Sequence, residues 1–91
     1  MTSFETDRET LRALADEGNE RALDRLADLA DERNDVDELS ELLDEGCVRA
    51  GEFLTRRAAA AHDLRELQRI ADAGYDEAAD VLDRLLAGTS D

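Results

Sequence analysis

The chain has 91 residues, no proline, a single cysteine and a formal net charge of −14, from 11 basic and 25 acidic residues. This length allows one domain with a modest core. The negative charge excludes direct binding to the phosphate backbone of nucleic acids and to anionic membrane surfaces, which would repel it. A single cysteine excludes a disulfide framework within the chain.

The composition predicts an all-α fold. The apolar residues are mainly alanine and leucine, and the only aromatic residues are Phe4, Phe53 and Tyr75. Alanine and leucine favour helices, whereas strands favour β-branched and aromatic residues. The first ten residues have neither the basic region nor the apolar run of a signal peptide, and no stretch reaches a membrane-spanning length. We therefore expect a cytoplasmic helical protein.

The sequence contains three consecutive repeats of equal length, and they align without gaps. The repeats are residues 7–34, 35–62 and 63–90, within a single domain of residues 1–91. The positions that carry the same residue in every repeat are Asp7/Asp35/Asp63, Leu11/Leu39/Leu67, Asp16/Asp44/Asp72, Gly18/Gly46/Gly74, Ala22/Ala50/Ala78 and Leu26/Leu54/Leu82. Such self-similarity is the signature of a repeat architecture.

Each repeat predicts a short helix followed by a longer one. The short helices are expected between an aspartate and a glycine, within residues 7–18, 35–46 and 63–74, and the long helices fill the rest of each repeat. The aspartate is a good N-cap because its carboxylate accepts hydrogen bonds from free amides of the first turn. The glycine ends the short helix because it adopts the left-handed conformation without strain. Six helices in three hairpins result.

Apolar residues recur three and four positions apart on one face of each predicted helix. On the short helices they include Val36, Leu39, Leu42, Leu43, Leu64, Leu67, Ile70 and Ala71, and on the long helices Ala22, Leu26, Leu29, Ala30, Ala50, Phe53, Leu54, Ala58, Ala78, Val81, Leu82, Leu85 and Leu86. One hairpin cannot bury this face alone, so we expect three hairpins to stack around a continuous core. Arg8 and Arg25 replace apolar residues of the later repeats, as expected for a terminal repeat with one face in water.

The segment ALDRLADLADERNDVDELSELLDEG, from Ala22 to Gly46, resembles tetratricopeptide-type helical hairpins, including their Sel1-like branch. Ala22, Leu26, Ala27 and Ala30 fall where that family places its packing residues. The run ADAGYDEAADVLDRLLA, residues 71–87, is similar to the junction between Sel1-like units. The resemblance implies a right-handed αα-hairpin solenoid that serves as a protein-binding scaffold, without a cofactor and without enzymatic activity.

In hairpins of this kind the long helices line a concave groove, which implies partner-binding residues at equivalent positions of the three long helices. These candidates are Asp24, Asp28, Asp31, Glu52, Arg56, Ala59, Asp80, Arg84 and Ala87. The family's basic cradle for a carboxylate is replaced by an acidic ring of Asp24, Glu52 and Asp80. We therefore expect a basic or mixed-charge protein or peptide segment as the partner. A merely solvated helix face is the alternative interpretation of these charges.

Neither catalysis nor metal binding is predicted. Cys47 and His62, the only cysteine and histidine, fall in turn positions far apart along one long helix, whereas nucleophilic catalysis needs the two in contact. They are too few for a structural zinc site. The acidic run DERNDVDE, residues 31–38, lacks the glycine and terminal glutamate of a calcium loop.

The acid at position 44 is unusual, because a helix C-terminus disfavours negative charge. It recurs in every repeat, as Asp16, Asp44 and Asp72. Our hypothesis is that Asp44 faces the positive N-terminus of the following long helix across the turn, so that replacing it by asparagine lowers stability.

Two other roles stay open. The chain could be an oligomerisation or spacer module, or a repeat array without a ligand of its own, in which Phe4, Phe53 and the apolar ends of the stack mediate self-association. A less favoured alternative is an acidic mimic of DNA, which would require charges spaced like phosphates. All basic residues are arginine, and an acidic surface without lysine is typical both of salt adaptation and of GC-rich codon usage.

Overall fold

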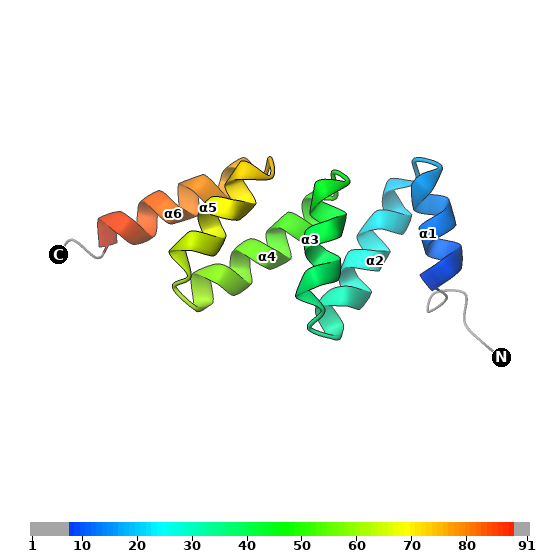
Figure 1. Ribbon diagram of the computed structural model, residues 1–91, viewed down its shortest axis with the longest axis horizontal. Coiled ribbons are helices and arrows are strands. Elements are labelled where there is room, and N and C mark those ends of the chain that lie inside the picture. Colours follow the sequence, from blue (N-terminus) through cyan, green and yellow to red (C-terminus); the bar gives the residue numbers. More distant parts are fainter. Residues whose placement is uncertain (1–7, 89–91) are drawn as a thin grey trace.

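The computed structural model describes residues 8–88, which form six helices and no strand (Figure 1). The helices are α1 (Arg8–Asp16), α2 (Glu20–Glu32), α3 (Val36–Asp44), α4 (Val48–Ala60), α5 (Leu64–Asp72) and α6 (Asp76–Gly88). Helices of 9 and 13 residues alternate, and each sequence repeat contributes one of each length. The predictions of an all-α fold and of short and long helices in alternation are confirmed over these residues.

The predicted caps are present at the C-termini of the three short helices and at the N-termini of α3 and α5. Asp35 and Asp63 each accept a hydrogen bond at Oδ1, over 3.1 Å, from the backbone N–H three residues later. Asp7 lies outside the described residues. At the C-terminus of α3, Gly46 has φ of +97° and donates to the Leu43 carbonyl, while Cys47 donates to the Leu42 carbonyl. This pair of bonds is a Schellman motif, which satisfies two carbonyls that the helix leaves open.

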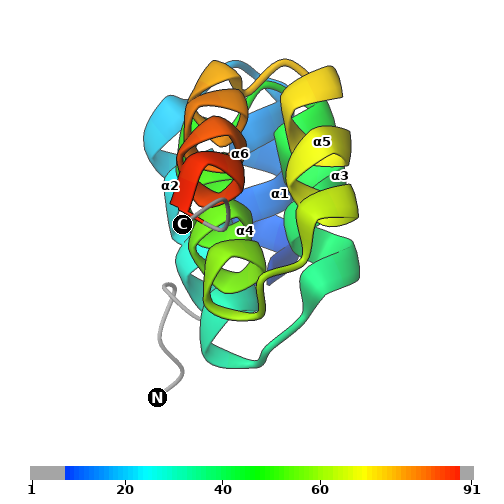
Figure 2. The same ribbon diagram turned by 90° about the vertical axis from the view of Figure 1, so that its left-hand side faces the viewer.

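The helices pack in two layers along an elongated molecule. Each helix contacts the next one in the chain, and α4 also contacts both α2 and α6. Viewed along the long axis, α2, α4 and α6 lie on one side and α1, α3 and α5 on the other (Figure 2). The molecule measures 55 × 23 × 16 Å along its principal axes. These neighbour contacts are consistent with a helical repeat.

The core runs through the stack between the two layers. Its largest fully buried side chains are Leu26, Leu39, Leu42, Leu54, Leu67 and Ile70. The alanine that recurs at the start of each long helix is buried in all three copies, at Ala22, Ala50 and Ala78. A small side chain at this position lets the long helix pack closely against its neighbours. Within residues 8–88, no helix is both long enough and apolar enough to cross a membrane.

Candidate functional site

The predicted partner-binding residues lie on the three long helices. Asp24, Asp28 and Asp31 belong to α2, Glu52 and Arg56 to α4, and Asp80 and Arg84 to α6. We call these seven residues the long-helix face. Five of them have exposed side chains, while Asp28 and Asp31 are half-buried. Because α4 packs against both α2 and α6, the seven residues are carried by consecutive helices of one layer.

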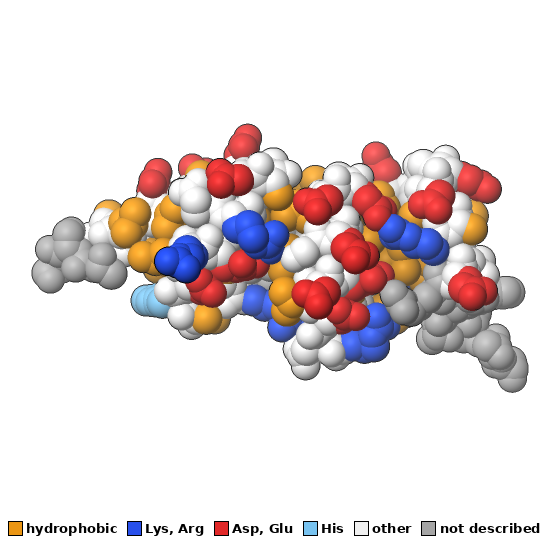
Figure 3. Space-filling view, in the orientation of Figure 1, with side chains coloured by type: hydrophobic (Ala, Val, Ile, Leu, Met, Phe, Trp, Pro, Cys, Tyr) orange, Lys and Arg blue, Asp and Glu red, His pale blue; other side chains and the backbone are white. Residues whose placement is uncertain are grey.

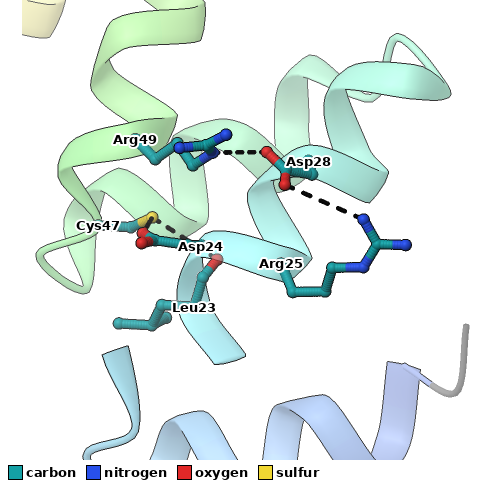
Figure 4. Close-up of polar contacts among 6 residues, drawn as sticks. All are labelled: Leu23, Asp24, Arg25, Asp28, Cys47 and Arg49. Atoms are coloured by element: carbon teal, nitrogen blue, oxygen red, sulfur yellow. Dashed lines mark hydrogen bonds and ion pairs between the residues drawn. The ribbon is translucent and has the colours of Figure 1, made fainter. Parts of the chain in front are cut away.

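The two half-buried aspartates are held within the molecule by arginines of α4. Asp28 accepts a hydrogen bond from Arg49 Nε over 2.5 Å, and Arg25 Nη1 lies 4.0 Å from its second oxygen (Figure 4). Asp31 accepts from both Nε and Nη2 of Arg57, over 3.0 and 2.6 Å, and Nη2 also donates to the Asp31 backbone carbonyl over 2.9 Å. Asp28 and Asp31 therefore fasten α2 to α4, and this lowers their availability to a partner.

Arg56 is placed over an aromatic ring. The guanidinium carbons of Arg49 and Arg56 each lie 5.7 Å from the centroid of the Phe53 ring. Both distances are within the range of cation–π attraction. The ring therefore links Arg56 to Arg49, whose hydrogen bond to Asp28 raises the pKa of the guanidinium above its ordinary value. The Arg56 side chain is exposed, and its contact with the Phe53 ring restricts its orientation.

The remaining charges of the long-helix face have no ion-pair partner among the described residues. Asp24, Glu52 and Asp80 occupy the same position on α2, α4 and α6, one in each sequence repeat, and all three are exposed. Arg84 is exposed one turn further along α6. The arrangement therefore offers one solvated carboxylate on each of three adjacent helices.

Cys47 lies at the turn before α4, in the wall of a surface pocket of about 440 Å³ that Leu23 and Asp24 also line. Its Sγ is 3.7 Å from the Leu23 carbonyl oxygen and 3.9 Å from Asp24 Oδ1. The side chain is buried, and this desolvation raises the pKa of the thiol, with a smaller contribution from the Asp24 charge. Both effects favour the protonated thiol, which is a weak nucleophile.

Cys47 and His62 are kept apart by the helix between them. Cys47 is the N-cap of α4, and His62 follows the last turn of the same helix, exposed and with φ of +54°. A helix of 13 residues is about 20 Å long, so the two side chains do not meet. Within the part of the chain that the structure describes, no group of three or more His, Cys, Asp or Glu side chains could hold a metal ion.

The short helices are joined by a second set of charged contacts. Arg12 of α1 forms an ion pair with Glu45 after α3, and this hydrogen bond raises the pKa of the Arg12 guanidinium. Arg69 of α5 pairs with Glu66 and also donates to Ser40 Oγ of α3 over 3.1 Å. Figure 3 shows acidic side chains along the whole length of one face, with fewer basic ones between them. This acidic surface is therefore partly neutralised by arginines in fixed positions.

Asp44 acts on α5. The pKa of Arg69 is raised mainly by its hydrogen bond to Glu66, and the Asp44 charge adds to this shift. No hydrogen bond joins the Asp44 side chain to an amide of α4 within residues 8–88. The proposed contact with the N-terminus of the following helix therefore has no hydrogen bond to support it, and the charge on Arg69 offers a reason for the acid.

Three residues of this region were not predicted from the sequence as site residues, namely Arg49, Phe53 and Arg57. Phe53 was assigned to packing, although its spacing of four from Arg49 and three from Arg56 places all three on one side of α4. That spacing was the available signal. The pairing of Arg49 and Arg57 with residues 21 and 26 positions earlier had no local signal.

No family model, no curated protein and no solved structure matches this chain.

Proposed function

We propose that this protein is a right-handed αα-hairpin solenoid of the tetratricopeptide or Sel1-like kind, which binds a protein or peptide segment through the long-helix face. The three equal sequence repeats and the contacts of α4 with α2 and α6 support the solenoid. The role is that of a scaffold and requires no cofactor. A single buried thiol fits a reducing compartment such as the cytoplasm.

One observation carries the proposal, the row of exposed carboxylates at Asp24, Glu52 and Asp80. The other two acids of the long-helix face are bound by Arg49 and Arg57, so only this row is available to an incoming cation. A row with one charge on each helix runs across the helices, not along one of them. A partner that follows it crosses the stack.

The spacing of the row defines the partner. Packed helices lie about 8–10 Å apart, and an extended chain advances about 3.3 Å per residue. Three residues of an extended segment therefore span one helix. A segment with arginine or lysine at every third position would place one cation opposite each carboxylate, while Arg56 and Arg84, one turn away, would accept acidic residues between them. The partner class is an extended basic or mixed-charge peptide.

Fluorescence anisotropy with labelled peptides tests this proposal. One peptide carries arginine at every third position, and a second has the same composition with its arginines clustered. We expect the first peptide to bind more tightly. Neutralising the row through Asp24→Asn, Glu52→Gln and Asp80→Asn together should weaken its binding about tenfold, because three exposed charge contacts are lost.

The matched control removes three acids elsewhere. Glu17→Gln, Asp37→Asn and Glu41→Gln give the same change in net charge at exposed positions outside the long-helix face. This triple variant should bind the spaced peptide within about twofold of the original protein at about 0.15 M salt, where charges beyond about 8 Å are screened. Equal weakening by both triple variants, or equal binding of both peptides, would show non-specific attraction and refute the assignment of the binding site to the long-helix face.

A further inference from the structure

The two ends of the stack expose apolar positions that are buried inside it. Leu14 of α1 is 37% exposed, whereas its equivalents Leu42 and Ile70 are each 0% exposed. The difference follows from the packing, because α3 and α5 each pack on a preceding long helix, α2 and α4 respectively. Within the described residues α1 has no such helix before it. The exposed side of α1 therefore corresponds to the side of α3 and α5 that packs against the preceding long helix.

The other end shows the complementary difference. Leu82 of α6 is half-buried, while its equivalents Leu26 and Leu54 are each 2% exposed. Leu86 is 48% exposed, whereas Ala30 and Ala58 at the same position are buried. Hydrophobic side chains gather on α6 at this end of the molecule (Figure 3). The exposed side of α6 corresponds to the side of α2 and α4 that packs against the following hairpin.

We infer that the α6 end of one molecule binds the α1–α2 hairpin of a second copy, head to tail. Each internal junction already joins these two kinds of surface, since α3 and α4 pack on α2, and α5 and α6 pack on α4. The partner on α6 is thus defined by continuity with an interface that occurs twice in the molecule. A head-to-tail contact of this kind is heterologous, and it builds open chains unless its rotation closes a ring.

A like-charge contact between the two copies weakens this association. At the α2–α4 junction Asp28 accepts a hydrogen bond from Arg49, and at the next junction the same two positions carry Arg56 and Glu77. At the junction between copies, these positions are Arg84 of one copy and Arg21 of the other, both with exposed side chains. Two arginines replace an oppositely charged pair, so the contact opposes unlimited chain growth.

Charge reversal at these two positions tests the inference in the full chain. Arg84→Asp recreates the Asp28–Arg49 combination between copies, and Arg21→Glu recreates the Arg56 and Glu77 combination. Sedimentation velocity over a concentration series that reaches the millimolar range should show each single variant associating roughly threefold to tenfold more tightly than the original protein. The double variant places Asp opposite Glu, and it should lose this gain.

Arg65→Glu is the matched control for net charge. Arg65 is exposed, and its equivalent Asp37 stays exposed beside an internal junction. This variant has the same charge change as the other two single variants and should not associate more tightly than the original protein. A gain from Arg84→Asp without a gain from Arg21→Glu, or the reverse, would show that positions 84 and 21 do not face each other across the contact. Either result, or monomers throughout, would overturn the inference.

A second pair of variants tests the apolar part of the interface. In the Arg84→Asp background, Leu14→Gln should lower association at least fivefold, whereas Val48→Gln should leave it unchanged. Val48 is 61% exposed and lies at neither end of the stack. Equal effects of the two substitutions would refute the role of α1. If circular dichroism shows that the Leu14 variant is unfolded, the charge series alone decides. That series is independent of the peptide assay, so either proposal can fail without the other.

Discussion

The two places where one long helix packs on the next, α2 against α4 and α4 against α6, fill equivalent positions with different chemistry. At the first junction Asp31 binds Arg57, whereas the corresponding residues of the second junction are Ala59 and Leu85. At the first junction Leu23 and the small Cys47 line one pocket, with the thiol 3.7 Å from the Leu23 carbonyl oxygen, while the second junction has Gly51 against Tyr75. One junction is therefore tied by charge and the other by an aromatic ring over a glycine.

This difference shows which property of a junction the fold requires. Ion pairs between partly exposed groups contribute only about 0–1 kcal/mol each, so the charges at the first junction are not essential for stacking. Volume is more constrained, because interiors are close-packed. A Cβ atom added at Gly51 would lie 2.7 Å from Tyr75 Cδ1 and 3.2 Å from Leu43 Cδ1. A large residue on one helix thus requires a small one on the next.

The largest expected effect comes from giving the second junction the leucine of the first. Gly51→Leu should lower the free energy of unfolding by about 3 kcal/mol, because the new side chain occupies the space of the Tyr75 ring. The gain in helix propensity from replacing glycine, about 0.8 kcal/mol, is too small to offset this loss. Urea unfolding followed by circular dichroism measures the difference.

The double variant Gly51→Leu with Tyr75→Cys reproduces the Leu23 and Cys47 combination and should regain most of the lost stability. Ala79→Leu is the matched control, since position 79 is equivalent to position 51 but lies on α6, where no later helix packs within the described residues. Its effect should stay within about 0.5 kcal/mol. A double variant no more stable than Gly51→Leu would show that Tyr75 does not set the size limit at position 51.

An intermediate effect is expected when the ion pair of the first junction is replaced by the residues of the second. Asp31→Ala alone should cost about 1 kcal/mol, because it leaves Arg57 half-buried without its partner, while water still reaches about a third of each side chain. Asp31→Ala with Arg57→Leu should be nearly neutral, since replacing both partners of a pair by apolar groups removes the cost of an unpaired charge. The urea midpoints of Asp31→Ala and of the double variant measure these two changes in stability. A double variant as unstable as Asp31→Ala alone would contradict this expectation.

The smallest effect concerns the Tyr75 hydroxyl, which donates to Glu77 Oε1 over 2.7 Å. Burial, and then this hydrogen bond, raise the pKa of Tyr75 above its ordinary value. The folded protein therefore keeps the proton at a pH where the unfolded chain, with a pKa of about 10, releases it. The corresponding stabilisation is fully present below pH 10 and declines as the pH rises above it.

Tyr75→Phe should cost about 0.5 kcal/mol at neutral pH, through loss of the hydrogen bond. Its unfolding free energy should then fall less than that of the original protein above about pH 10. The comparison is direct, because the chain has one tyrosine and no lysine, so few other side chains titrate there. Parallel curves for the two proteins across this range would show that Tyr75 ionises equally in the folded and unfolded states.

The local features of this protein could be read from the sequence. Helix limits follow from an aspartate that caps the first turn and a glycine that adopts positive φ at the end, as at Asp35 and Gly46, and both act within a few residues. The alternation of short and long helices follows from the sequence repeat in the same way. The alanines that face a neighbouring helix, such as Ala50, are also evident from their recurrence.

The tertiary structure decided which charges of the long-helix face are bound and which are exposed. Asp24, Asp28 and Asp31 look alike in sequence, but only the last two meet an arginine of α4, while Asp24 stays exposed. The contact of Gly51 with Tyr75 could not be predicted from the sequence either. These pairs are 21–26 residues apart, and whether they meet depends on the angle and offset at which two helices pack. The period of the sequence sets the order of the helices, but side-chain volumes at each junction set that angle and offset.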